Sequence, residues 1–139
     1  MAVIERDGSS PDLVTRILWE EVHKANLGRK RFTYVVLDTG LQDAVYAEAK
    51  NALDAHNGES TLFRINGSGV GIIAHDSKTV AQAVRAIRSN AHEFLSVVHH
   101  IDYMPTSTNA RDDSLALYRQ MEQKRLDKAV YNLDSQIAP

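Results

Sequence analysis

The chain has no cysteine among its 139 residues. Disulfide bridges, thiol catalysis and thiolate metal sites are therefore excluded, and a reducing compartment is compatible with this composition. The chain also lacks an apolar run near the roughly 20 residues of a membrane span, and its start shows no signal-peptide pattern. We therefore expect a soluble, cytoplasmic protein with no membrane partner.

An excess of basic charge is missing as well. Lys and Arg number 16 against 18 Asp and Glu, which gives a net charge of −2 at pH 7. A general nucleic-acid binder needs a basic face for phosphate contacts, so nucleic acid is not an expected partner. Hydrophobic residues make up 43% and charged residues 24%, as in ordinary globular proteins. We expect one α+β domain over 1–139, with a flexible N-terminus over 1–10 and a frayed C-terminus over 134–139.

Apolar residues recur at helical spacing in four segments. Ser10 and Pro11 supply a capping hydroxyl and a proline for the first helical position, and Gly28 supplies a stop. Charges of both signs crowd 122–128 in the last segment, which is typical of a solvated face. The expected helices are 11–28, 41–56, 77–91 and 114–133.

Segments rich in β-branched and aromatic residues alternate with these helices and predict strands. The near-continuous apolarity of 32–37 is expected of a central strand that is covered on both faces or on one crowded face. Two further runs flank Asn66-Gly67-Ser68-Gly69, the strongest short-range signature of a tight hairpin. The expected strands are 32–37, 61–65, 70–76 and 94–104.

This order of elements predicts a ferredoxin-like or palm-like βαββαβ antiparallel sheet, with extra N- and C-terminal helices. The inner two helices would share one face. In that topology the third strand lies antiparallel beside the first, so the hairpin tip meets the end of the first strand. We therefore expect Asp38 to lie beside Gly67, Ser68 and Gly69.

Asp38 is the carboxylate best placed for chemistry. Mg²⁺ wants one or two carboxylates together with substrate phosphates, and here only one carboxylate reaches the hairpin tip. Two interpretations stay open: Asp38 is a metal ligand, or it caps the following helix or anchors the turn, which is the commoner role. The tip has two interpretations as well. Its backbone N–H groups would approach a phosphate, or it is a plain turn that needs positive φ.

The histidines argue against a shared metal site. His99 and His100 are neighbours on a strand, so their side chains point to opposite faces. His75 lies on a strand that does not pair with theirs in the expected topology. One of the pair is expected to be a hydrogen-bonded core histidine, and the other to be exposed or at an interface.

The strand 35–38, which ends in Asp38, and the segment 63–70, which holds an arginine and the hairpin, resemble a degenerate GGDEF domain. That family is the palm-like fold of diguanylate cyclases, in which the first strand ends in a metal-binding aspartate. The resemblance implies Asp38 as metal ligand. It implies a ligand-binding set of Asp38, Arg64, Asn66, Gly67, Ser68 and Gly69. Similarities of lower specificity lie in 12–16, 71–73, 116–119 and 124–125.

The departures from that family bear on activity. Asn66 stands at the signature's first glycine, Ser68-Gly69 at its acidic pair, and Gly40 at the second aspartate. The segment between the first strand and the hairpin is also too short for the family's two helices, so the resemblance implies no cyclase chemistry. A Cas2-like protein has the same βαββαβ order and an aspartate ending its first strand, and is the competing resemblance.

We expect a non-catalytic binding or regulatory module without a cofactor, acting through a protein partner or a small nucleotide. The alternative is a divergent nucleotidyl-transfer or phosphodiester-cleaving enzyme that uses Mg²⁺ on Asp38, with Asp76 or Asp102. A homodimer would form by edge pairing of the sheet or through the terminal helices.

Overall fold

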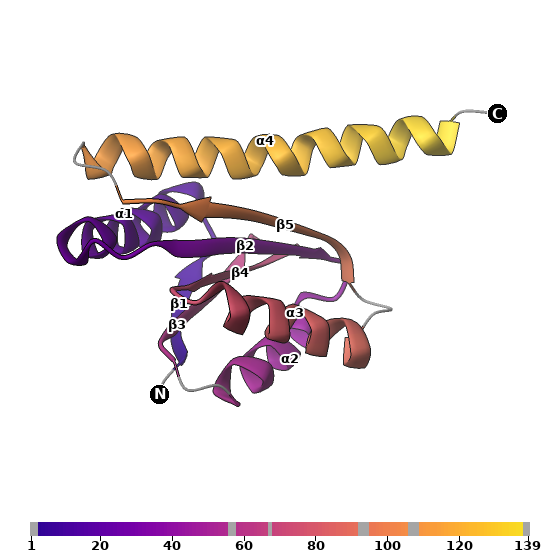
Figure 1. The fold of residues 1–139 in the computed structure, drawn as a ribbon. Coiled ribbons are helices and arrows are strands. Elements are labelled where there is room, and N and C mark those ends of the chain that lie inside the picture. The colour runs from indigo at the N-terminus through magenta and orange to yellow at the C-terminus, as the bar shows by residue number, and fades with distance from the viewer. Residues whose placement is uncertain (1–2, 56–57, 67, 92–94, 106–108, 138–139) are drawn as a thin grey trace.

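A computed structural model describes residues 3–55, 58–66, 68–91, 95–105 and 109–137. These residues form five strands and four helices in an α+β arrangement (Figure 1). In chain order the elements are β1 (Val3–Gly8), α1 (Pro11–Gly28), β2 (Phe32–Thr39), α2 (Gln42–Asp54), β3 (Ser60–Ile65), β4 (Gly69–Ala74), α3 (Ser77–Ala91), β5 (Leu95–Tyr103) and α4 (Ala110–Ile137).

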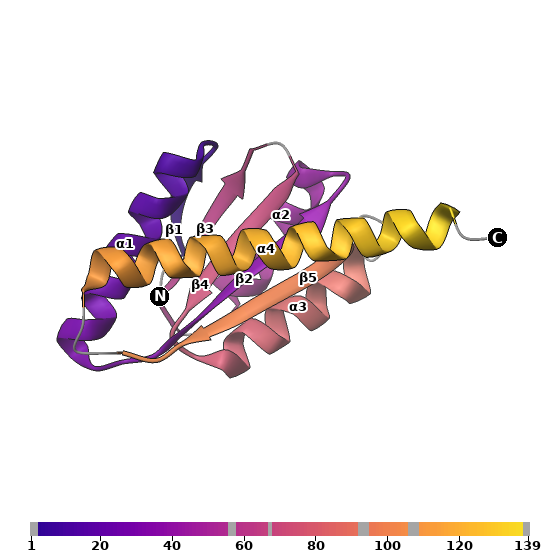
Figure 2. The same cartoon turned by 90° about the horizontal axis from the view of Figure 1, so that it is seen from above.

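The strands form one mixed sheet in the order β1-β3-β4-β2-β5. β1 runs parallel to β3, whereas the other three pairs are antiparallel. Figures 1 and 2 show α1 and α4 on one face of the sheet and α2 and α3 on the other. Within the described part of the chain, no helix is both long and apolar enough to cross a membrane.

β2 lies inside the sheet and contributes to a separate hydrophobic core on each face. Phe32, Tyr34 and Val36 pack with residues of α1 and α4, and Val35 and Leu37 pack with residues of α2 and α3. Successive side chains of a strand point to opposite faces, so one apolar run supplies both cores. The expectation of a central strand covered on both faces is confirmed.

The strand pairing expected around the hairpin is confirmed. β2 lies antiparallel beside β4, and Asp38 is the register partner of Gly69. The expected start of α1 is confirmed as well, because Ser10 Oγ accepts a hydrogen bond from Leu13 N at 3.2 Å and Pro11 is the first helical residue.

Two expectations about the chain ends differ from the structure. Val3–Gly8, expected to be flexible, form β1 at the sheet edge beside β3. Its two apolar residues, Val3 and Ile4, are only half-buried, and three charged or polar residues follow them, so the segment VIERDG carries too weak an apolar pattern to be recognised as a strand. α4 begins at Ala110 and continues to Ile137, beyond both ends of the expected 114–133 helix.

Candidate functional site

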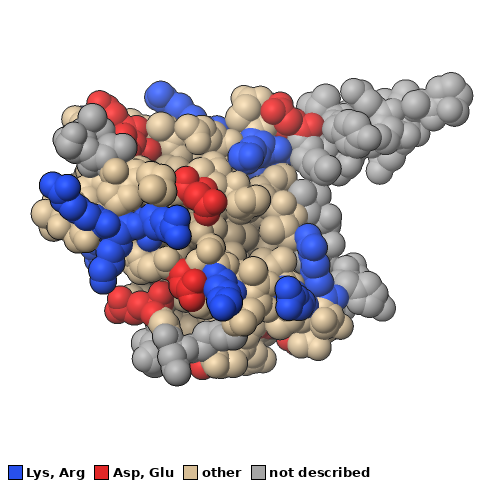
Figure 3. Space-filling model, in the orientation of Figure 1, with Lys and Arg blue, Asp and Glu red and all other residues tan. Residues whose placement is uncertain are grey.

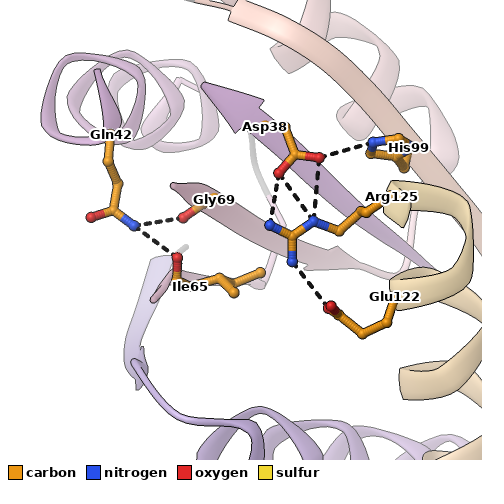
Figure 4. Close-up of polar contacts among 7 residues, drawn as sticks. All are labelled: Asp38, Gln42, Ile65, Gly69, His99, Glu122 and Arg125. Carbon is orange, nitrogen blue, oxygen red and sulfur yellow. Dashed lines mark hydrogen bonds and ion pairs between the residues drawn. The ribbon is translucent and has the colours of Figure 1, made fainter. Parts of the chain in front are cut away.

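Asp38 lies near the end of β2 and points toward α4, where Arg125 binds its carboxylate (Figure 4). Arg125 Nη2 donates to Asp38 Oδ1 at 2.7 Å. Arg125 Nε donates to both carboxylate oxygens, at 3.0 Å to Oδ1 and 3.2 Å to Oδ2. His99 Nε2 from β5 lies 3.0 Å from Asp38 Oδ2. Two partners from different elements therefore occupy this carboxylate.

The Arg125–Asp38 pair is largely shielded from solvent. The Arg125 side chain is 16% exposed and the Asp38 side chain 24%. Burial disfavours the charged guanidinium, but the hydrogen bond and charge of Asp38 outweigh burial, so the pKa of Arg125 is raised above its ordinary value. Glu122 Oε1 accepts from Arg125 Nη1 at 3.0 Å and completes the cluster. The expectation that 122–128 is simply a solvated face is wrong at Arg125.

The interpretation of Asp38 as a helix cap is wrong. α2 packs on the opposite face of the sheet from α4, and its N-cap residue, Leu41, makes no side-chain capping bond. The nearby turn is instead closed by Thr39, whose Oγ1 accepts from Leu41 N at 3.0 Å. Asp38 joins β2 to α4 and β5.

The two neighbouring histidines lie as expected. His99 is 8% exposed and hydrogen-bonded to Asp38, whereas His100 is exposed and lines a groove on the other face of the sheet. His75 lies beyond the far end of β4, with Nδ1 3.4 Å from Arg31 O. Among the described residues no three His, Asp or Glu side chains gather in a way that could hold a metal ion.

The hairpin tip is tied to its neighbours by backbone hydrogen bonds. Thr39 N donates to Ser68 O at 2.9 Å, and Ser68 N donates to Ile65 O at 3.1 Å. Gln42 Nε2 from α2 donates to Ile65 O at 3.2 Å and to Gly69 O at 2.8 Å (Figure 4). Ser68 N–H is therefore already used within the turn.

The ends of the tip differ in exposure. Asn66 is exposed with φ of 23°, the left-handed conformation expected of such a turn. Gly69 is buried, and a Cβ there would lie 3.3 Å from Arg125 Nη2. Gly69 thus leaves room for the guanidinium that crosses it. Gly67 lies outside the described residues.

Arg64 is not brought to Asp38. Its guanidinium lies 3.7 Å from the centroid of the Tyr46 ring in α2, on the opposite face of the sheet. Its Nε donates to Asp43 Oδ1 at 3.1 Å. The residues that the GGDEF resemblance implies as a ligand-binding set therefore do not lie together. Asp38 and Gly69 lie on the α4 face of the sheet, and Arg64 lies on the α2 face.

The two carboxylates that the enzyme alternative would add lie far from Asp38. Asp102 is the register partner of Thr33, at the opposite end of β2, and accepts from Thr33 Oγ1 at 2.7 Å. Five residue steps along the strand lead from Thr33 to Asp38, a distance of about 17 Å. Asp76 accepts from Lys78 N at 2.9 Å at the start of α3.

An open cavity with a volume of about 610 Å³ lies between α3 and the strands β2 and β5. Val35, Val80, Val84 and Val98 supply apolar walls. Polar side chains also border it: Arg85 and Arg88 from α3, and His100 and Asp102 from β5. We call this cavity the α3–β5 groove. Figure 3 shows several Lys and Arg side chains over the part of the surface where α3 lies.

Sequence reasoning missed this groove, although two signals for it exist. Ala81, Val84, Arg85 and Arg88 follow helical spacing and so share one face of α3. His100 and Asp102 alternate along β5 and so share one face of the sheet. Relating these two faces requires the register between β5 and β2 and the position of α3, which no local pattern contains.

Compared with known proteins, the chain matches no family model and no curated sequence.

Proposed function

We propose that this protein is a non-catalytic binding module that acts through a small nucleotide or a protein partner. One observation carries the proposal. The carboxylate of Asp38, which metal-dependent chemistry would need, is bound by Arg125 and His99. Asp76 and Asp102 make their own hydrogen bonds elsewhere. The arrangement thus favours a structural role for Asp38.

The energy of the Asp38–Arg125 pair supports this proposal. A Mg²⁺ ion that binds Asp38 would have to displace Arg125 from the carboxylate, or it would leave the carboxylate less able to neutralise the charge of Arg125. Breaking this largely shielded ion pair leaves part of the guanidinium charge without compensation, at a cost of about 2–3 kcal/mol, between the costs for exposed and fully buried pairs. A magnesium site assembled on one carboxylate has little binding energy to offset this cost.

We further propose that the inner unit from β2 to β5 has the ferredoxin-like or palm-like topology. Its strand order β3-β4-β2-β5, with α2 and α3 on one face, supports this proposal. Kinship with a degenerate GGDEF domain is supported by the pairing of Asp38 with Gly69. A Cas2-like arrangement competes, because it shares the same order of elements. A cytoplasmic location also stays a prediction.

A homodimer stays part of the proposal for a protein partner. β5 is an edge of the sheet and pairs with β2 alone among the described strands. The other edge of β5 therefore offers backbone groups for pairing with a second copy. Light scattering at high protein concentration tests this arrangement, and a strictly monomeric protein would contradict it.

A turnover assay tests the central proposal. The full chain is incubated with GTP, or with a phosphodiester substrate, in the presence of Mg²⁺ or Mn²⁺, and products are separated by chromatography. We expect no product above the protein-free control. Turnover by the wild-type protein that Asp38→Asn abolishes, with circular dichroism showing a folded variant, would overturn the proposal.

A further inference from the structure

The two ends of the α3–β5 groove differ in charge. Thr33 is the register partner of both Ala74 and Asp102, so Asp102 lies near the end of β4, where α3 begins. Arg85 and Arg88 lie about two and three helical turns further along α3. The groove therefore has an acidic end and a basic end.

The basic end has no partner among the described residues of the protein. Neither Arg85 nor Arg88 forms a hydrogen bond or ion pair with another described residue, although both border the groove. Three arginines elsewhere in the protein are paired with carboxylates: Arg6 with Glu20, Arg64 with Asp43 and Arg125 with Asp38. Arg85 and Arg88 are thus two neighbouring guanidinium groups on the border of a cavity that stay open to an external anion.

The acidic end has a carboxylate oxygen that is available to accept a hydrogen bond from a ligand. Thr33 Oγ1 donates to Asp102 Oδ1, and within the described part of the chain no hydrogen bond is made to Oδ2. Thr33 is buried, so this bond fixes the carboxylate against the floor of the groove. Between the two ends, Val84 and Val98 offer apolar surface.

We propose that the α3–β5 groove binds a nucleoside 5′-phosphate, with its phosphate on Arg85 and Arg88. Guanidinium groups are well suited to phosphate because their N–H donors match its oxygens in pairs. Asp102 accepts hydrogen bonds from ribose hydroxyl or base N–H groups. The base or sugar ring lies against Val84 and Val98. This inference rests on the small-nucleotide form of the proposed function.

The dimensions of the groove fit such a ligand better than a single ion. Its volume of about 610 Å³ lies within the roughly 300–1,000 Å³ of small-molecule sites. Ser77 and Arg88 both line it, and eleven residues of helix rise about 16 Å. An inorganic phosphate would reach only the arginines, whereas a nucleotide extends toward Asp102.

Isothermal titration calorimetry on the full chain tests the proposal, with AMP, GMP, CMP, UMP, inorganic phosphate and the four nucleosides as probes. The test variant is Arg85→Gln with Arg88→Gln, which keeps good helix formers and removes both charges. The matched control is Arg119→Gln, an exposed arginine of α4 on the other face of the sheet.

We expect at least one of the four nucleotides to bind, and to bind about tenfold or more weakly to the double variant. Phosphate and the nucleosides should bind more weakly than that nucleotide, and Arg119→Gln should bind like the wild type. Unchanged affinity in the double variant would overturn the proposed nucleotide site in the groove, but the protein would still bind a nucleotide elsewhere. Failure of all four nucleotides to bind the wild type would overturn both the groove and the nucleotide form of the proposed function.

Discussion

β2 and β5 carry charged side chains on both faces of the sheet. These side chains are held in a largely buried cluster on one face and border an open groove on the other. On the α4 face, Asp38 and His99 are held together with Arg125 in a largely buried cluster. On the α3 face, Asp102 lies in an open groove beside Arg85 and Arg88, which have no carboxylate partner in the described structure.

A carboxylate at a strand end is therefore not by itself a sign of chemistry. Asp38 has the position of a site residue, yet the protein's own arginine neutralises it. The charged side chains of the groove, Arg85, Arg88 and Asp102, lie on a surface that no short sequence motif marks. Three predictions test this contrast between a closed and an open face.

The largest effect is expected from Asp38→Ala. The substitution removes Asp38 from Arg125, whose side chain is only 16% exposed and keeps Glu122 as its remaining carboxylate partner. Exposed ion pairs contribute up to about 1 kcal/mol and broken buried pairs cost about 3–5 kcal/mol. We expect an intermediate loss of about 2–3 kcal/mol in the free energy of unfolding, measured by urea denaturation.

Asp43→Ala is the control for that loss. Asp43 also pairs with an arginine, Arg64, but its side chain is 89% exposed. Its removal should cost less than about 1 kcal/mol. Equal losses in Asp38→Ala and Asp43→Ala would contradict the view that the α4 face is a closed structural cluster.

A smaller effect on the free energy of unfolding is expected from the titration of Tyr46, which lies in α2 on the α2–α3 face of the sheet. Burial, together with the hydrogen bond to Glu5 at 2.6 Å and its charge, raises the pKa of Tyr46 to about 12. The unfolded chain loses this proton near pH 10. Between pH 10 and 12 the unfolded state therefore binds fewer protons, and the free energy of unfolding falls as pH rises.

Urea denaturation between pH 8 and 11.5 checks this sign. The fall should be smaller in Tyr46→Phe, which removes the titrating group. Part of the fall should persist, because burial also raises the pKa of Tyr34. A stability that rises over this pH range, or a fall unaltered in Tyr46→Phe, would show that Tyr46 is not held neutral in the folded protein.

The smallest effect is expected for Arg85→Gln with Arg88→Gln. Because neither side chain has a partner in the described structure, the free energy of unfolding should change by less than about 0.5 kcal/mol. Thermal and urea unfolding of the double variant measure this change. A loss comparable to that of Asp38→Ala would mean that the two arginines stabilise the fold and are not reserved for a ligand.

Much of the fold could be predicted because its signals are local. Ser10 and Pro11 mark the start of α1, and the turn 66–69 marks the β3–β4 hairpin. Supersecondary order then placed Asp38 beside Gly69. β1 could not be predicted, because an edge strand with a weak apolar pattern is recognised only by its pairing with β3.

The candidate site was less predictable because its contacts are distant in sequence. Arg125 lies 87 residues from Asp38, inside a stretch of mixed charge that resembles a solvated helix face. Whether His99 or His100 is buried depends on strand register, since a shift of one residue exchanges their faces. The groove depends on the same register and on the packing of α3.

The most direct test follows valine methyl signals by NMR while the nucleotide that binds most tightly is titrated into the protein. Val84 and Val98 line the α3–β5 groove, whereas Val36 lies within 3.6 Å of the Cβ position of Gly69 on the closed face. We predict shifts at Val84 and Val98 and none at Val36. Shifts at Val36 alone would place the ligand at the hairpin and Asp38, and would contradict the account.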